Sequence, residues 1–531
     1  MENISISQEQ ENRIKRIKAI QERLDSVHID RKDNEEGELQ EELRKLVSEE
    51  KEFVSHAREI NNNLSRPVIN ADRSQTDILK GIIQIDKTRG VWDIAEYLIL
   101  KYKIKTIGNR DNTKEIYLYE GGYYRVDYGI IKKEIIDITE SSVSSHTREE
   151  IIKVIKEKTY MERKYFSVEP EYINLKNGIY NVRSKEFSNH DPDKLFLHQI
   201  PASYNKDADC PKIKEFLNQI LDEESIKVVQ EWFGYCLYRK YFIKKAIIFV
   251  GEKDTGKTTV LKLKARFLGG DNISGVSLQK ISSDKFALSN LYQKHANIYD
   301  DLSFKDINDN GTFKMLAGNG PTTAERKFGD QFQFENYAKL TFSCNKIPKI
   351  LDSDDEAYFS RWIIIRFEHS SKKPDKFLID KITTNEELSG LLNFALEGLE
   401  RILHNQNFSY SKSAEEIKKE MCMSASSLAK FVYDELEAVS DVNYYLTKDD
   451  LYQEFVNYAS RNDLPIIPKE TLGKNLPQFI TVGAGRKSLL NKETGKKKQY
   501  ECWIGIKLKN GNFTPPKEAE SINDPFSFDQ V

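Results

Sequence analysis

One loop constrains this chain more than any other feature. The sequence reads Gly251-Glu252-Lys253-Asp254-Thr255-Gly256-Lys257-Thr258-Thr259 directly after the apolar run 246–250. An apolar strand followed by G-x-x-x-x-G-K-[ST] predicts a phosphate-binding loop, and the apolar residues at 260–263 predict that a helix begins behind it. The alternative is a chance match in a glycine-containing loop. Because strands and helices alternate over about 245–370, we expect an α/β core around this loop.

The residues of this loop have distinct expected roles. The glycines let the backbone wrap the phosphates with its N–H groups pointing inward. Lys257 is expected to neutralise the β- and γ-phosphates of a nucleoside triphosphate, and the Thr258 hydroxyl to hold Mg²⁺. The predicted nucleotide-binding residues are Gly251, Asp254, Thr255, Gly256, Lys257, Thr258 and Thr259.

Composition limits the class of protein. The chain has 531 residues, 39% hydrophobic and 31% charged, which suits a soluble protein of three or four domains. No apolar run is long enough to span a bilayer and the N-terminus is polar, so we expect no membrane or secretion signal and a cytoplasmic or intracellular location. The five cysteines lie far apart and predict reduced thiols. With a net charge of −3, any nucleic-acid surface must be local.

Polar residues follow two later strands. Asp300 and Asp301 end a short strand about forty residues after the loop. Since Mg²⁺ needs a carboxylate at a strand end and the attacking water needs a base, we expect Asp300 to serve the metal and Asp301 the water. A surface acidic pair is the alternative. Asn345 follows the apolar strand 339–344 and can hydrogen-bond both the water and the γ-phosphate, or it is an ordinary turn residue.

Two further segments are candidates for contact with a partner. Arg361 precedes the apolar run 362–367 and is a candidate arginine finger for a neighbouring subunit's site. Its rival is Arg366, and a structural salt bridge is the alternative. Lys327 and Phe328 lie near the tip of a predicted hairpin, where a basic residue beside an aromatic suits nucleic acid. The alternative is an exposed hairpin whose charge has no function.

The order of these motifs resembles the superfamily 3 helicases, particularly the phage, plasmid and poxvirus primase-associated branch, which is built on an AAA+ core. The resemblance covers roughly residues 77–510. Further segments similar to that family, before and after the core, are Asn174–Tyr180, His190–Pro192, Cys210–Lys212 with Phe216 and Leu217, Glu231–Tyr235, Leu446–Tyr452 and Trp503–Ile506.

The resemblance implies a homo-hexameric ring that uses ATP and Mg²⁺ to move along single-stranded and forked DNA, usually 3′ to 5′. It implies that one subunit supplies most of each ATP site and that Arg361 of the neighbouring subunit completes that site. It also implies that Lys327 and Phe328 line the central channel. The residues concerned are Lys257, Thr258, Asp300, Asp301 and Asn345 for the site, and Lys327 and Phe328 for the channel.

The sequence departs from this family at two positions. Asp301 stands where the branch often has Glu, so the base is one methylene shorter, and Trp362 stands where a second Arg is common. Relatives often carry an N-terminal primase domain, whereas only about seventy-five residues precede the matching region here. We therefore expect no primase site in this chain, and a separate primase or polymerase as a further partner.

The expected fold class is α/β, an AAA+ P-loop core with a parallel sheet, preceded by mixed α+β and helical domains and followed by a winged-helix domain. The N-terminal segment is either a helical coiled coil or a partly disordered arm. The predicted parts are 1–66 (N-terminal helices), 77–204 (α+β pre-helicase domain), 205–244 (helical lead-in), 245–372 (core), 373–425 (helical lid or linker), 426–510 (winged helix) and 511–531 (flexible tail).

The C-terminal part carries a local excess of positive charge. Residues 469–509 contain ten Lys or Arg and only three Glu. Lys496, Lys497 and Lys498 resemble the turn of a β-wing, and with Lys487 they are predicted to bind DNA. The alternative is a solvated basic turn.

Three functions remain open from the sequence. The first is a replicative DNA helicase of a virus, phage or plasmid. The second is a DNA-binding initiation or assembly ATPase that switches oligomeric state without unwinding, which the basic C-terminal segment suits equally well. The third is a nucleotide-dependent remodeller of proteins, against which the family resemblance argues.

Overall fold

The structure is a computed structural model, and it describes residues 73–108, 114–140, 143–162, 168–303, 310–318, 320–325, 331–348, 355–369, 375–490 and 497–509. The predicted N-terminal helices, the tail, and Lys327, Phe328 and Lys496 lie outside these residues. The chain divides into two compact units, Met1–Tyr180 with Phe187–Gln199, and Asn181–Glu186 with Ile200–Val531.

The first unit combines helices with a four-stranded sheet of order β3-β2-β1-β4 and the small sheet β5-β6-β7. Three of its helices begin at side-chain caps, Asp86, Asp127 and Ser144: the Asp127 carboxylate, for example, accepts from the backbone N–H of Ile130 at 3.1 Å. Its elements are α3 (Arg73–Ile85), α4 (Lys87–Tyr102), β1 (Lys105–Gly108), β2 (Lys114–Glu120), β3 (Tyr123–Val126), α5 (Tyr128–Thr139), α6 (Ser145–Lys158), β4 (Tyr160–Glu162), β5 (Tyr172–Leu175), β6 (Gly178–Asn181) and β7 (Glu186–Ser188).

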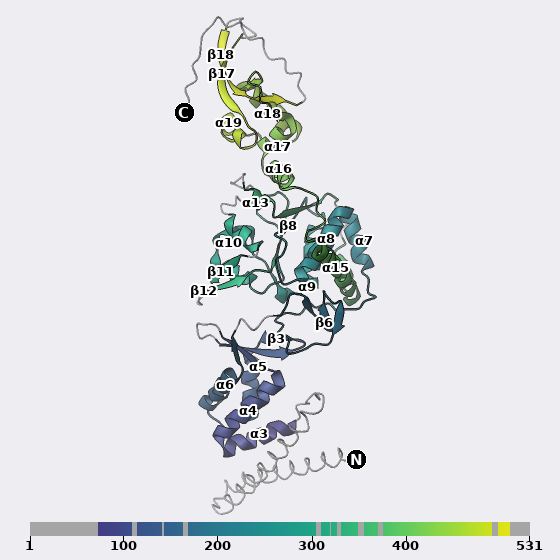
Figure 1. Ribbon diagram of the computed structural model, residues 1–531, viewed down its shortest axis with the longest axis vertical. Helices are drawn as coiled ribbons and strands as arrows, with labels where there is room; N and C mark the ends of the chain where they lie inside the picture. Colours follow the sequence, from purple (N-terminus) through teal and green to yellow (C-terminus); the bar gives the residue numbers. More distant parts are fainter. Residues whose placement is uncertain are drawn as a thin grey trace, which may run out of the picture. The chain divides into compact units, whose positions relative to one another are not determined.

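The second unit is built on a five-stranded sheet of order β14-β8-β13-β10-β9, in which every neighbouring pair is parallel. In Figure 1, α7, α8 and α15 lie on one side of β8, and α10 with the β11–β12 hairpin lies on the other. The strands and hairpin are β8 (Ala246–Gly251), β9 (Ile273–Ser274), β10 (Ala296–Tyr299), β11 (Pro321–Glu325), β12 (Gln331–Glu335), β13 (Lys339–Cys344) and β14 (Trp362–Phe367).

Short connections and helices surround this sheet. The helix α8 begins at Asp222, whose carboxylate accepts from the backbone N–H of Ser225 at 2.7 Å. The helices are α7 (Pro211–Ile220), α8 (Glu223–Leu237), α9 (Lys257–Leu268), η2 (Gly270–Asn272), α10 (Leu278–Ser283), α11 (Lys285–Leu288), η3 (Ser289–Leu291), α12 (Gly311–Leu316), α13 (Glu356–Phe359), α14 (Leu378–Lys381), α15 (Asn385–Asn405) and α16 (Ala414–Ala425).

Burial explains why the central strands read as continuous apolar runs. Every residue of β13 is buried, as are the first five of β8, which is the pattern of a parallel sheet covered on both faces. Phe313 stacks on Trp362 at the start of β14, with ring centroids 4.7 Å apart. The predicted mixed α/β fold with a parallel sheet is confirmed, whereas the AAA+ assignment stays a prediction.

The C-terminal region has its own apolar core, formed by residues of α17, α18 and α19 with Trp503 and Ile506. Its elements are α17 (Ser427–Glu435), β15 (Leu436–Ala438), β16 (Tyr445–Thr447), α18 (Lys448–Arg461), α19 (Lys469–Asn475), η4 (Leu476–Gln478), β17 (Gly483–Leu490), β18 (Lys497–Ile504) and β19 (Ile506–Leu508). Lys497 and Lys498 are paired with β17 and open a strand, so their predicted place in a turn is wrong. The winged-helix assignment remains a prediction.

Candidate functional site

The loop after β8 has the backbone that its glycines predict. Gly256 has a φ of +96°, in the left-handed region, and immediately precedes α9. A Cβ at Gly256 would lie 3.0 Å from Cδ1 of Ile220, so both the conformation and the packing disfavour a side chain there. The tight turn between β8 and α9 therefore depends on this glycine.

Lys257, the first residue of α9, is held inside the loop. Its Nζ donates to the carbonyl oxygens of Gly251 at 2.7 Å and Glu252 at 2.6 Å. Burial lowers the pKa of this ammonium group, and the charge of Asp300 opposes that shift. The position at a strand–helix junction is the one from which a lysine reaches the phosphates of a bound nucleotide.

Thr258 and Asp300 come together although they are far apart in the sequence. The Thr258 hydroxyl donates to Oδ2 of Asp300 at 2.7 Å. Oxygen ligands of this kind, one carboxylate and one hydroxyl beside a phosphate loop, are those with which proteins hold Mg²⁺ on a nucleotide. The two side chains fit a magnesium ion, and both residues are exposed to solvent.

Asp301 and Asn345 lie at the same edge of the sheet as the loop. Asp301 is exposed and has a φ of +55°, a conformation that Asp tolerates better than most residues. Asn345 is exposed and follows β13, which lies between β8 and β10. Because the strands are parallel, the carboxyl ends of β8, β10 and β13 meet at this edge.

The two candidate arginines are separated by the length of β14. Arg361 precedes this strand, and its carbonyl accepts from the N–H of Ala246 at 2.6 Å, at the amino edge of the sheet. Its Nε donates to the carbonyl of Lys314 at 3.3 Å. Arg366 lies near the carboxyl edge, where its Nε donates to Glu420 at 2.6 Å. The structure thus places Arg361 away from the loop of its own chain.

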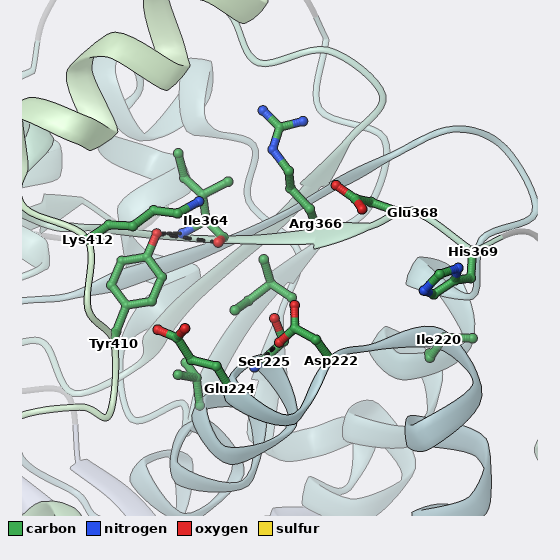
Figure 2. A pocket seen from close by; sticks show the side chains of 12 residues that line it. Ile220, Asp222, Glu224, Ser225, Ile364, Arg366, Glu368, His369, Tyr410 and Lys412 are labelled. Carbon is green, nitrogen blue, oxygen red and sulfur yellow. Dashed lines mark hydrogen bonds between the residues drawn. The ribbon is translucent and has the colours of Figure 1, made fainter.

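A cavity of about 240 Å³ lies between the start of α8 and the end of β14. Ile220, which packs on Gly256, lines it. Figure 2 shows Asp222 and Glu224 at the start of α8 on one side, and Arg366 and Glu368 of the β14 segment on the other. This cavity could not be predicted from the sequence, because its walls come from three separate segments.

Sequence reasoning also missed Ser343. This buried residue of β13 donates through its hydroxyl to Oδ1 of Asp300. Its position two residues before Asn345 is a signal that could have been used. A hydroxyl near the end of one strand can reach carboxylates that follow the neighbouring strand.

Of the predicted DNA-binding residues, Lys487, Lys497 and Lys498 lie on the β17–β18 hairpin. The Nζ of Lys487 lies 5.3 Å from the ring centroid of Tyr445, and that of Lys498 lies 5.4 Å from the ring centroid of Tyr500. Cations held over aromatic rings on one hairpin suit contact with a nucleic-acid backbone.

Within the described residues, none of the helices is long and apolar enough to cross a membrane.

Comparison with known proteins finds similarity in two parts of the chain. Residues 17–222 match a family model described as D5 N terminal like, and residues 249–361 match a family of unknown function (DUF5906). The second match runs from within β8 to Arg361 and so includes the loop after β8, Asp300, Asp301 and Asn345. No curated protein matches the chain.

Solved structures match over most of the chain at low similarity. Two apo structures of the C-terminal region of NrS-1, both in an A form, each cover 78% of this chain and 98% of their own. Their identities are 12% and 13%, with TM-scores of 0.42 and 0.44. These values are too low to indicate an activity for this chain.

Proposed function

We propose that this protein is an ATP-dependent replicative DNA helicase of a virus, phage or plasmid, with an AAA+ core of the superfamily 3 type. The observation that carries the proposal is the meeting of Lys257, Thr258 and Asp300 at one edge of a parallel sheet. The D5 N terminal like match supports it, because that match ends before the core, over the region that resembles the domain preceding such helicases.

In this proposal the site's residues divide the work on ATP. Lys257 leaves the carbonyls of Gly251 and Glu252 and neutralises the β- and γ-phosphates. Thr258 and Asp300 would hold Mg²⁺, which would supply positive charge to neutralise the charge that develops on the phosphates. Asp301 accepts a proton from the attacking water, and Asn345 orients that water.

The remaining proposals concern partners. Arg361 lies at the edge opposite the loop, which supports a role in a neighbouring subunit's site and hence a ring, a hexamer by analogy with the family. Lys327 and Phe328 are proposed to line the channel, with Lys487, Lys496, Lys497 and Lys498 as DNA contacts outside it. Polarity of 3′ to 5′, and a separate primase or polymerase, are likewise part of the proposal.

The test is strand displacement on a forked DNA with ATP and Mg²⁺. We expect unwinding by the wild type and none by Lys257→Ala, with ATP hydrolysis lost in parallel. Lys253→Ala is the matched control, since Lys253 is an exposed lysine of the same loop. The helicase proposal is wrong if the folded wild type hydrolyses ATP in response to DNA yet separates no strands.

That last outcome would favour a second candidate, an initiation or assembly ATPase that switches oligomeric state. The basic β17–β18 hairpin supports it, because such a factor needs a DNA-binding surface but no motor. Sedimentation with and without ATP would then show a nucleotide-dependent change of oligomer.

A further inference from the structure

Ser343 connects the two aspartates of the site to β13. Its hydroxyl donates to Oδ1 of Asp300 and lies 3.3 Å from the backbone N–H of Asp301, which donates to it. Its carbonyl accepts from the N–H of Leu302 at 2.7 Å. One fully buried residue thus contacts three successive residues of the acidic turn.

These contacts give the two carboxylate oxygens of Asp300 different surroundings. Oδ1 accepts from Ser343 and from the N–H of Asp301, at 3.0 Å. Oδ2 accepts from Thr258, the other predicted magnesium ligand. A hydroxyl has a single proton to donate. Ser343 donates it to the Asp300 carboxylate, and its oxygen accepts the hydrogen bond from the backbone N–H of Asp301. The carboxylate is therefore held in one orientation, with Oδ2 directed at Thr258.

We propose that Ser343 is a positioning residue that orients Asp300 for Mg²⁺ and fixes the backbone of Asp301. The inference rests on the proposed ATPase function and goes beyond it. Hydrogen bonds to a ligating carboxylate commonly tune metal affinity, and their loss typically costs 10–100-fold. The left-handed backbone of Asp301 has no glycine to relieve it, so its N–H contacts to Ser343 and Asp300 also hold the second aspartate in place.

The experiment measures Mn²⁺ binding to the full chain in the presence of ADP, by electron paramagnetic resonance, with Mn²⁺ as the probe for the magnesium site. For Ser343→Ala we expect about 10–100-fold weaker Mn²⁺ binding, and unchanged ADP affinity when metal is absent. Cys344→Ala is the matched control, because Cys344 is the buried neighbour on the same strand. Ser343→Thr, which keeps the hydroxyl, should restore most of the affinity.

The outcomes separate the inference from the function. Wild-type binding of Mn²⁺ and ADP, with equal binding by Ser343→Ala, would overturn the positioning role and leave the ATPase intact. If the wild type binds neither, the proposed function fails and the inference fails with it. If Ser343→Ala does not fold, Ser343→Cys replaces it. The thiol is a weak hydrogen-bond donor, so we expect a smaller loss of Mn²⁺ affinity. An affinity equal to that of the wild type would contradict the proposal.

Discussion

The two edges of the five-stranded sheet differ in the chemistry they carry. At the carboxyl edge, Thr258 and Ser343 hydroxyls contact the carboxylate of Asp300 close to the phosphate loop. At the amino edge, cationic side chains end on backbone carbonyls: Lys339 donates to Tyr238, Tyr337 and Lys240, at 2.6, 2.8 and 3.1 Å. Lys245 likewise donates to the carbonyl of Ser360 at 2.7 Å.

The difference separates a binding edge from an edge that stabilises the fold. At the carboxyl edge, the side chains of Thr258, Asp300, Asp301 and Asn345 are exposed and can exchange their partners for a ligand, whereas Ser343 is buried. At the amino edge, Lys339 and His295 are buried and contact backbone carbonyls of the fold. Arg361 also lies at the amino edge, where it is only partly buried, as is Lys245. Because Arg361 is the candidate arginine finger, its substitution tests whether the amino edge takes part in catalysis.

The largest expected effect is that of Arg361→Ala. If Arg361 completes a neighbour's site, ATP hydrolysis should fall by about 10³-fold. Mixing Arg361→Ala with Lys257→Ala subunits should restore part of the activity, because some interfaces then combine an intact loop with an intact arginine. ATPase assays on the mixtures make the measurement.

Arg366→Ala is the comparison variant for that experiment, since Arg366, the other candidate arginine, lies on the strand that Arg361 precedes and pairs with Glu420. Mixtures that regain nothing would mean that Arg361 only stabilises its own subunit through the carbonyls of Lys314 and Ala357. The amino edge would then have no role in catalysis.

A smaller effect is expected from His295, at the amino edge. Burial lowers the pKa of this imidazole to about 3, and Nδ1 lies 2.8 Å from the carbonyl oxygen of Cys236. Below pH 6.5 the unfolded state binds a proton that the folded state does not, so stability falls as the pH falls from about 6.5 towards 3. Between pH 8 and pH 5 this group should cost about 2 kcal/mol.

Urea unfolding of the wild type and His295→Asn at the two pH values tests this. The variant should lose about 2 kcal/mol less than the wild type between pH 8 and pH 5, even if it is less stable at pH 8. The exposed His404 provides the control variant His404→Asn. Equal losses in wild type and His295→Asn would contradict a structural role for the buried imidazole in acid sensitivity.

The smallest expected effect is that of Asn345→Ala, at the carboxyl edge. Loss of one hydrogen bond to the attacking water should lower kcat about tenfold, or about 1.4 kcal/mol, with little change in KM. Steady-state ATPase kinetics measure it, with the exposed neighbour changed in Lys346→Ala as control. An unchanged kcat would indicate that Asn345 is an ordinary turn residue. The catalytic site would then consist of residues of the loop and the two aspartates.

Much of the binding edge could be predicted from local pattern. The loop, Asp300, Asp301 and Asn345 each follow an apolar strand, and the end of a buried strand is visible in the sequence. The contacts at the amino edge could not be predicted, because Lys339 is a lysine within apolar surroundings and two of its acceptors are backbone carbonyls of a distant segment. The pattern of apolar and polar residues along the chain does not indicate which distant carbonyl a lysine will contact.

Local patterns in the sequence predict where the strands end, which residue types stand there, and a loop of the phosphate-binding type. The strand order, with β13 between β8 and β10, is visible in the folded chain alone, and it brings Ser343 to Asp300 and puts Arg361 at the opposite edge. The physical reason is that apolar periodicity and turn chemistry act over a few residues, whereas strand order follows from packing among segments that are about a hundred residues apart along the chain.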